Sequence, residues 1–323
     1  MKKIIVIGMG NVGTTFVNIA VARGLQAEFV FIDKNEALCE AHAHDFQDMV
    51  ALMPRNNSTF RQGTFADAKG ADIAVVAASI SVPADKLTDR LALAGANAKL
   101  MKTFGDELVK NDFKGVVVVA ANPCDVMASV FPYASGIPAE KVISTGTLLD
   151  SARFKKFIAE KLNINADSVQ GSILAEHGAS AMAVYSMLKV GDSNIQDLIN
   201  AGVLKKEELD EILVKTVKEG FYIYSRKGNT QFGIGTSIYE ITDAVLNNKR
   251  SVMNVGVKLP QGYKNAGIYT SIPVIVGENG YEYLPVKPNF SAEELAAFEK
   301  STASLAKVHS DTLGTIGVEK DFQ

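Results

Sequence analysis

The sequence contains little cysteine and no long apolar run. Its two cysteines, Cys39 and Cys124, lie far apart in the sequence and form no Cys-x-x-Cys pair, so neither a zinc site nor a disulfide framework is predicted. We expect both to be buried thiols in a reducing cytoplasm. The apolar run at residues 4–7 is too short for a signal segment, and the run at residues 115–121 is about a third of a membrane span. We therefore expect no membrane segment.

The sequence also lacks an excess of basic charge. The formal net charge is -3 at pH 7, and nucleic acids and anionic membranes both require clustered lysine and arginine. We therefore expect neither as a partner. The apolar fraction of 47% is ample for a core, and 323 residues are enough for two medium-sized domains, which we expect.

Short β-branched runs alternate with helix-compatible stretches in the first half of the chain. Strands this apolar are usually buried on both faces, as in a parallel sheet that helices cover. The pattern predicts a doubly wound α/β domain of the Rossmann type over residues 1–145. Its predicted strands are residues 3–8, 28–33, 73–78, 116–121 and 142–145.

The order of the elements changes after residue 145, and an α+β substrate domain is predicted over residues 146–323. Ser291 begins the last predicted helix with a capping box and the helix runs to about residue 313. No flexible linker separates the two domains, so we expect them to pack tightly. The other predicted helices are residues 148–162, 205–224 and 236–247, and the predicted strands are residues 169–175, 180–185, 251–257 and 267–277.

A glycine motif follows the first predicted strand and opens a helix. Glycines at this spacing permit a tight turn and let backbone N–H groups approach a pyrophosphate. The second strand ends at Asp33, whose carboxylate suits ribose hydroxyls and repels a 2′-phosphate, which favours NAD over NADP. Alternatives are a turn that only joins strand to helix, and an Asp33 that caps a helix. The predicted cofactor contacts are Gly8, Gly10, Asn11, Val12, Gly13, Asp33 and Asn122.

Three later segments and an arginine at a predicted helix start, Arg90, form an unusual set. Residues 122–125 read Asn-Pro-Cys-Asp, residues 146–153 read Gly-Thr-Leu-Leu-Asp-Ser-Ala-Arg, and residues 176–178 read Glu-His-Gly. Across essentially its whole length the sequence resembles the L-lactate and malate dehydrogenase superfamily, which shows Asn-Pro-x-Asp, Gly-Thr-x-Leu-Asp-x-x-Arg and Glu-His-Gly in this order. Shorter strings, such as Val-Phe-Ile-Asp before residue 34, are most similar to L-2-hydroxyisocaproate dehydrogenases.

The resemblance implies an NAD-dependent enzyme that transfers a hydride between the cofactor and the 2-position of a small 2-hydroxy acid. It also implies a cytoplasmic homo-oligomer, either a dimer or a tetramer. Reduction of a 2-oxo acid needs a proton donor, a cation for the carboxylate and a group that polarises the carbonyl. The resemblance assigns each of these roles to a residue of this sequence.

His177 is the expected acid and base, because imidazole titrates near neutral pH. Asp150 is expected to hold its other ring nitrogen. Arg153 lies three residues after Asp150, on the same helix face, and its planar fork suits a carboxylate. The alternatives are a structural histidine and an ordinary helix salt bridge between Asp150 and Arg153.

Three further residues are expected at the site. Arg90 is expected to polarise the substrate carbonyl from a loop, residues 79–89, that closes over the bound pair. Asn122 is expected to bond the substrate oxygen or the nicotinamide ribose, and Thr230 to line the pocket. The alternatives are a solvated arginine, an asparagine that starts a turn, and a threonine outside the pocket.

Ala84 carries the substrate prediction. An alignment of residues 82–90 without gaps places it where lactate dehydrogenases carry glutamine and malate dehydrogenases carry arginine. Without that arginine the second carboxylate of oxaloacetate lacks a partner, unless Lys86 supplies one. A methyl group also enlarges the pocket, and each buried CH₂ contributes ~0.8 kcal/mol. We therefore expect an aliphatic 2-oxo monocarboxylic acid such as 2-oxoisocaproate.

Two alternatives remain open. One is an L-lactate dehydrogenase with an atypical substrate loop. The other is a catalytically silent NAD-binding protein, since a fold does not determine a function. Loss of one of the expected site residues would favour the silent protein, and His177, Asp150, Arg153 and Arg90 are all present.

Overall fold

Six parallel strands form the centre of the structure, a computed structural model that describes residues 1–80 and 90–322. They lie in the order β3-β2-β1-β4-β5-β6, which is the order of the doubly wound dinucleotide-binding sheet. The predicted fold class is confirmed. The strands are β1 (Lys2–Ile7), β2 (Ala27–Ile32), β3 (Thr59–Gln62), β4 (Ile73–Val76), β5 (Val116–Val119) and β6 (Val142–Ser144).

Five of these strands were predicted, and each ends one or two residues before the predicted end. They form because runs such as Val116–Val119 are buried along their whole length, as a sheet covered on both faces requires. The prediction missed β3. This strand lies at the sheet edge and only its Phe60 is buried, so its sequence shows little of the apolar signal.

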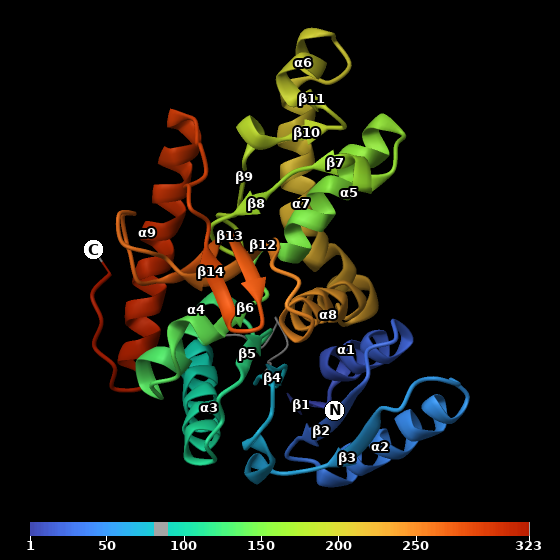
Figure 1. Cartoon of the computed structure of the whole chain (residues 1–323). Coiled ribbons are helices and arrows are strands. Elements are labelled where there is room, and N and C mark those ends of the chain that lie inside the picture. Colours follow the sequence, from blue (N-terminus) through green and yellow to red (C-terminus); the bar gives the residue numbers. More distant parts are fainter. Residues whose placement is uncertain (81–89, 323) are drawn as a thin grey trace.

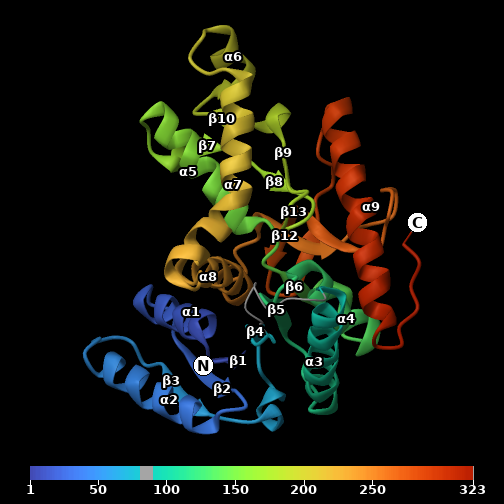
Figure 2. The same cartoon turned by 180° about the vertical axis from the view of Figure 1, so that it is seen from behind.

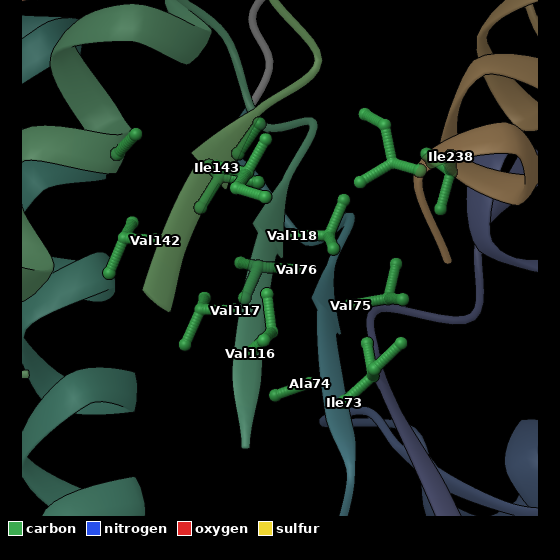
Figure 3. Close-up of a cluster of buried hydrophobic side chains, with 14 of the residues drawn as sticks. Ile73, Ala74, Val75, Val76, Val116, Val117, Val118, Val142, Ile143 and Ile238 are labelled. Carbon is green, nitrogen blue, oxygen red and sulfur yellow. The ribbon is translucent and has the colours of Figure 1, made fainter. Parts of the chain in front are cut away.

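Helices cover both faces of the sheet (Figures 1 and 2). On one face α1 packs against α8, and on the other α3 packs against α4 and α9. Figure 3 shows Val117 and Val142 pointing to one face, and Val75 and Val118 to the other, toward Ile238 of α8. The helices are α1 (Asn11–Ala22), α2 (Glu36–Ala51) beside β2 and β3, α3 (Arg90–Lys110), α4 (Cys124–Ala134), α8 (Phe232–Leu246) and α9 (Ala292–Gly314).

The sheet continues beyond β6 with strands from the end of the chain. Strands β12 (Ser251–Lys258), β13 (Tyr269–Gly277) and β14 (Gly280–Tyr283) are antiparallel, and β12 joins β6 at the pair Gly256 and Ser144. Within the described residues the sheet therefore has nine strands. The division into domains at residue 145 stays a prediction, since the sheet itself runs across that position.

A second part of the structure extends away from the sheet (Figures 1 and 2) and has its own apolar cluster, which includes Phe154, Ile158 and Leu209. The strand predictions here were too long. Residues 169–175 form two short strands, and residues 180–185 form only one of two residues, Met182–Ala183. The elements are α5 (Leu148–Leu162), β7 (Val169–Gln170), β8 (Ile173–Leu174), β9 (Met182–Ala183), β10 (Lys189–Val190), β11 (Ser193–Asn194), α6 (Ile195–Asn200) and α7 (Lys206–Lys227).

Two helices begin where the sequence predicts. Helix α5 occupies the predicted range although its N-cap residue makes no side-chain cap hydrogen bond, and Ser291 caps α9 in the predicted capping box with Glu294. Helix α8 begins at Phe232, earlier than the predicted Thr236, and has no side-chain cap at its start. Among the described residues, no helix is long and apolar enough to cross a membrane.

The buried sheet predicts a mutational effect. Val118 is fully buried in β5, so Val118→Ala removes two methyl groups and leaves a cavity, which should cost about 2–3 kcal/mol of unfolding free energy. Urea denaturation measures the loss. Val252→Ala is the matched control because Val252 is 59% exposed on β12, and it should cost less than about 0.5 kcal/mol. Equal losses in the two variants would contradict this account of the core.

Candidate active site

A cavity of about 430 Å³ lies where the chain leaves the carboxyl ends of β4, β5 and β6. Ligands in open α/β sheets bind at this edge. Six of the predicted site residues line the cavity together, although they come from distant parts of the sequence: Val12, Asn122, Asp150, Arg153, His177 and Thr230.

The glycine motif forms a tight turn beside this cavity, between β1 and α1. Gly8 has φ +99°, and a Cβ there would overlap with Ala78. A Cβ on Gly13 would overlap with the carbonyl oxygen of Gly8. Gly10 is the N-cap of α1, and no atom lies within 4 Å of where its Cβ would be. No side chain of the N-cap residue caps the first N–H groups of α1, which suits the binding of a pyrophosphate there.

Asp33 lies at the end of β2 and faces the glycine turn. Its Oδ2 accepts a hydrogen bond from the Met9 N–H at 2.9 Å, and its Oδ1 accepts one from the Asn35 N–H at 3.1 Å. The N-cap of α2 is Asn35, whose side chain accepts from Leu38, so the alternative that Asp33 caps this helix is wrong. The free lone pairs of Asp33 suit the ribose hydroxyls of NAD.

The Asp150 carboxylate joins His177, a predicted catalytic residue, to Arg153, a predicted substrate-binding residue. It lies in the first turn of α5, where its Oδ2 is 2.5 Å from His177 Nδ1 and its Oδ1 accepts from Arg153 Nη1 at 3.2 Å. The Asp150 side chain is 8% exposed and that of His177 31% exposed. Asp150 therefore holds one ring nitrogen of His177 and leaves the other available toward the cavity.

Burial and neighbouring charges together shift the pKa values of His177 and Asp150. Burial lowers the pKa of His177, but the adjacent Asp150 carboxylate offsets this effect, so the pKa of His177 is raised above its ordinary value. Burial raises the pKa of Asp150, but the charges of His177 and Arg153 outweigh it and the pKa of Asp150 is lowered. The pair therefore favours an ionised carboxylate beside a protonated imidazole.

Arg153 makes the ordinary helix salt bridge with Asp150 that is the alternative interpretation of its sequence position, and it also lines the cavity. The side chain is 11% exposed, and Asp150 is its hydrogen-bond partner among the described residues. One Nη1 contact leaves further guanidinium donors, which suit a carboxylate in the cavity. The two interpretations of Arg153 are therefore compatible.

Of the four other predicted substrate and catalytic residues, two line the cavity and two lie partly or wholly outside the described residues. Asn122 follows β5 and is exposed on the cavity wall, and Thr230 follows α7 on the same wall. Arg90 is the first residue of α3, as predicted, but its side chain lies outside the described part. Ala84, with residues 81–89 of the predicted loop, also lies outside the described residues.

Sequence reasoning missed one wall of the cavity, which α7 and α8 supply. Gly220 and Phe221 of α7 line it together with Ile234 of α8. The helical pattern of α7 marks an apolar face but does not show which turn meets the cavity. Thr145 and Leu149, at the end of β6 and the start of α5, were detectable by their place at a strand end.

Comparisons with known proteins agree with this geometry. Residues 2–144 match the model of the lactate/malate dehydrogenase NAD-binding domain, and residues 147–313 match that of the α/β C-terminal domain of the same enzymes. The chain belongs to the lactate/malate dehydrogenase family. It is an NAD-dependent 2-hydroxy acid dehydrogenase, as the sequence predicted.

Relatives of this chain cover nearly its whole length. It is 41% identical over 321 residues to the L-lactate dehydrogenase of Mycoplasmoides gallisepticum, which covers 98% of this chain and 99% of that protein. A lactate dehydrogenase from a Medee basin deep-sea metagenome has a TM-score of 0.91 and 30% identity, covering 96% of this chain and 98% of that one. A malate dehydrogenase of Picrophilus torridus has a TM-score of 0.90 and 26% identity, covering 98% of each chain.

The described residues contain no group of three or more histidine, cysteine, aspartate or glutamate side chains that could hold a metal ion. Cys39 and Cys124 are buried, as predicted. Burial is the first cause that raises the pKa of the Cys39 thiol to about 11. A buried thiol with a raised pKa stays protonated at neutral pH and is a poor nucleophile.

The shared carboxylate predicts a pH effect. With His177 as the predicted proton donor, reduction needs a protonated imidazole, and the rate should fall as pH rises through the pKa of that residue. Asp150→Asn removes the charge that raises this pKa, so the fall should begin at lower pH, and kcat/KM at pH 7 should drop ~10³-fold or more. A pH profile of NADH-dependent reduction measures both effects. An unchanged profile would contradict the role of Asp150.

Proposed function

We propose that this enzyme is an L-lactate dehydrogenase, which reversibly reduces pyruvate with NADH. The observation that carries the proposal is the single carboxylate that joins an imidazole and a guanidinium on one cavity wall. The names of relatives with up to 41% identity over nearly the whole chain support pyruvate as the 2-oxo acid. A cytoplasmic dimer or tetramer is part of the same proposal.

The residues divide the reaction between them. Bound NADH supplies the hydride. Arg153 binds the substrate carboxylate with its free guanidinium donors and so aims the 2-oxo carbon at the cofactor side of the cavity. His177 donates its proton to the ketone oxygen as negative charge develops there, and takes the proton back in the reverse direction. Asp150 stabilises the imidazolium before that transfer.

Two predicted residues complete the proposed site. Asn122 lies on the cavity wall near the end of β5, where its amide suits the substrate oxygen or the nicotinamide ribose. Arg90 is proposed to polarise the carbonyl, which rests on the sequence resemblance. Thr230 closes the wall at the end of α7, beside the space that Arg153 faces.

A larger aliphatic substrate, such as 2-oxoisocaproate, is a second candidate. The observation that favours it is Gly220, which lines the cavity beside Arg153 and carries no side chain. A Cβ at this position would be in ordinary contact, 3.6 Å from Arg153 Nη1, so its absence leaves space in the cavity next to this arginine. Ala181 and Val217 also present small side chains to the cavity.

A comparison of substrates tests the proposal. We expect kcat/KM with NADH to be at least ~10-fold higher for pyruvate than for 2-oxoisocaproate, and higher than for oxaloacetate. If 2-oxoisocaproate is preferred by a similar factor, the second candidate holds and the lactate proposal fails. His177→Gln is the control, because it should bind NADH normally and lose most turnover with every substrate.

The open space at Gly220 predicts a change in specificity. Gly220→Ala adds a methyl group beside Arg153, so kcat/KM for 2-oxoisocaproate should fall ~10-fold or more, while that for pyruvate changes less than ~3-fold. Gly314→Ala in α9 is the matched control, since its Cβ would have no atom within 4 Å. Equal losses for both substrates in Gly220→Ala would show that Gly220 does not line the space that holds the side chain of the substrate.

A further inference from the structure

A second buried carboxylate lies behind His177, outside the cavity wall. Asp125 is in the first turn of α4 and is 3% exposed. Its Oδ2 accepts a hydrogen bond from the backbone N–H of His177 at 3.1 Å, and its Oδ1 accepts one from Ser144 Oγ at 2.8 Å. The roles derived above leave this carboxylate unused.

The surroundings of Asp125 hold it in place. A Cβ on Gly256 of β12 would overlap with both the Asp125 carboxylate and Ser144 Oγ, so the backbone of β12 lies directly against them. The carboxylate is thus enclosed by α4, β6 and β12, which come from both halves of the chain. Its hydrogen bond fixes the segment that carries His177 to this enclosure.

The charge of Asp125 also acts on His177. Burial raises the pKa of Asp125 to about 6, and the nearby Glu176 contributes in the same direction. Above that pH the carboxylate of Asp125 is mainly ionised. Burial lowers the pKa of His177, while Asp150 and then Asp125 raise it, and Arg153 opposes them.

We propose that Asp125 is a positioning residue for the reduction. It holds the backbone of His177 against the sheet and adds a second negative charge that favours the protonated imidazole. This inference rests on the proposed function of His177 as the proton donor. A purely structural Asp125 would hold the segment in place without any effect on the protonation of His177.

Asp125→Asn tests the inference, because the amide keeps the size and an acceptor for the His177 N–H but removes the charge. We expect the pH at which reduction falls to half to move down by about half a unit or more, and kcat/KM at pH 8 to fall ~3-fold or more as a result. Affinity for NADH should stay within ~2-fold of the original enzyme. If the midpoint of the pH profile is unchanged, the proposal is overturned, whatever the turnover of the variant.

Glu294→Gln is the matched control. Glu294 is a buried carboxylate, 8% exposed, whose hydrogen bonds are to Ser186 and Ser291. The substitution removes the same charge by the same isosteric change, and the pH midpoint should stay in place. A shift as large as that of Asp125→Asn would show that the effect is not specific to Asp125, and the proposal would fail.

A measurement on the unmodified enzyme covers the case in which Asp125→Asn does not fold. The imidazole resonances of His177, identified by their loss in His177→Gln, should show a second inflection near pH 6 as Asp125 takes up a proton. A single inflection overturns the proposal. This titration needs no substrate, so it is separate from a failure of the enzyme to reduce pyruvate, which would overturn only the proposed function.

Discussion

The active site depends on one carboxylate with two cationic partners. Asp150 uses one oxygen for His177 and the other for Arg153, so a single buried side chain orients both the proposed proton donor and the proposed carboxylate-binding cation. Both cations stabilise its ionised form against the cost of burial. In the proposed reaction, a substrate carboxylate on Arg153 shares that cation with Asp150, which links substrate binding electrostatically to the acid.

The sheet supplies the positions on which this arrangement rests. Strand β6 leads through Thr145 and Gly146 into α5. Asp150 lies in the first turn of that helix, close to the end of a buried strand. Strand β5 ends next to Asn122, and β1 ends at the glycine turn. The predicted cofactor-binding and substrate-binding residues therefore lie at one edge of the sheet, because the carboxyl ends of its parallel strands all lie at that edge.

Much of this site could be predicted from the sequence, and the limits have physical causes. Buried strands and the capped helix α9 carry strong local signals, whereas β3 is half exposed at an edge and carries little. The position of Asp33 was predicted, but its hydrogen bond to the Met9 N–H depends on how two strands lie side by side. Gly220 could not be predicted, because only tertiary packing brings its turn of α7 to the cavity.

Substrate preference is hard to predict from the sequence for a similar reason. The prediction depends on Ala84, through an alignment with related enzymes, and Ala84 lies outside the described residues. The determinant proposed from the structure is instead Gly220, which lies beside Arg153. Only the packing of α7 against the cavity brings this glycine there, and a loop alignment does not include it.

The continuation of the sheet across residue 145 has a consequence for dissecting this enzyme. Strand β12 covers the outer edge of β6, so a chain ended after β6 would expose the main-chain donors and acceptors of a buried, apolar strand to water. Such an edge is a template for pairing with other chains and for aggregation. The cofactor half is thus protected in the intact protein by a hairpin that the chain makes more than a hundred residues later.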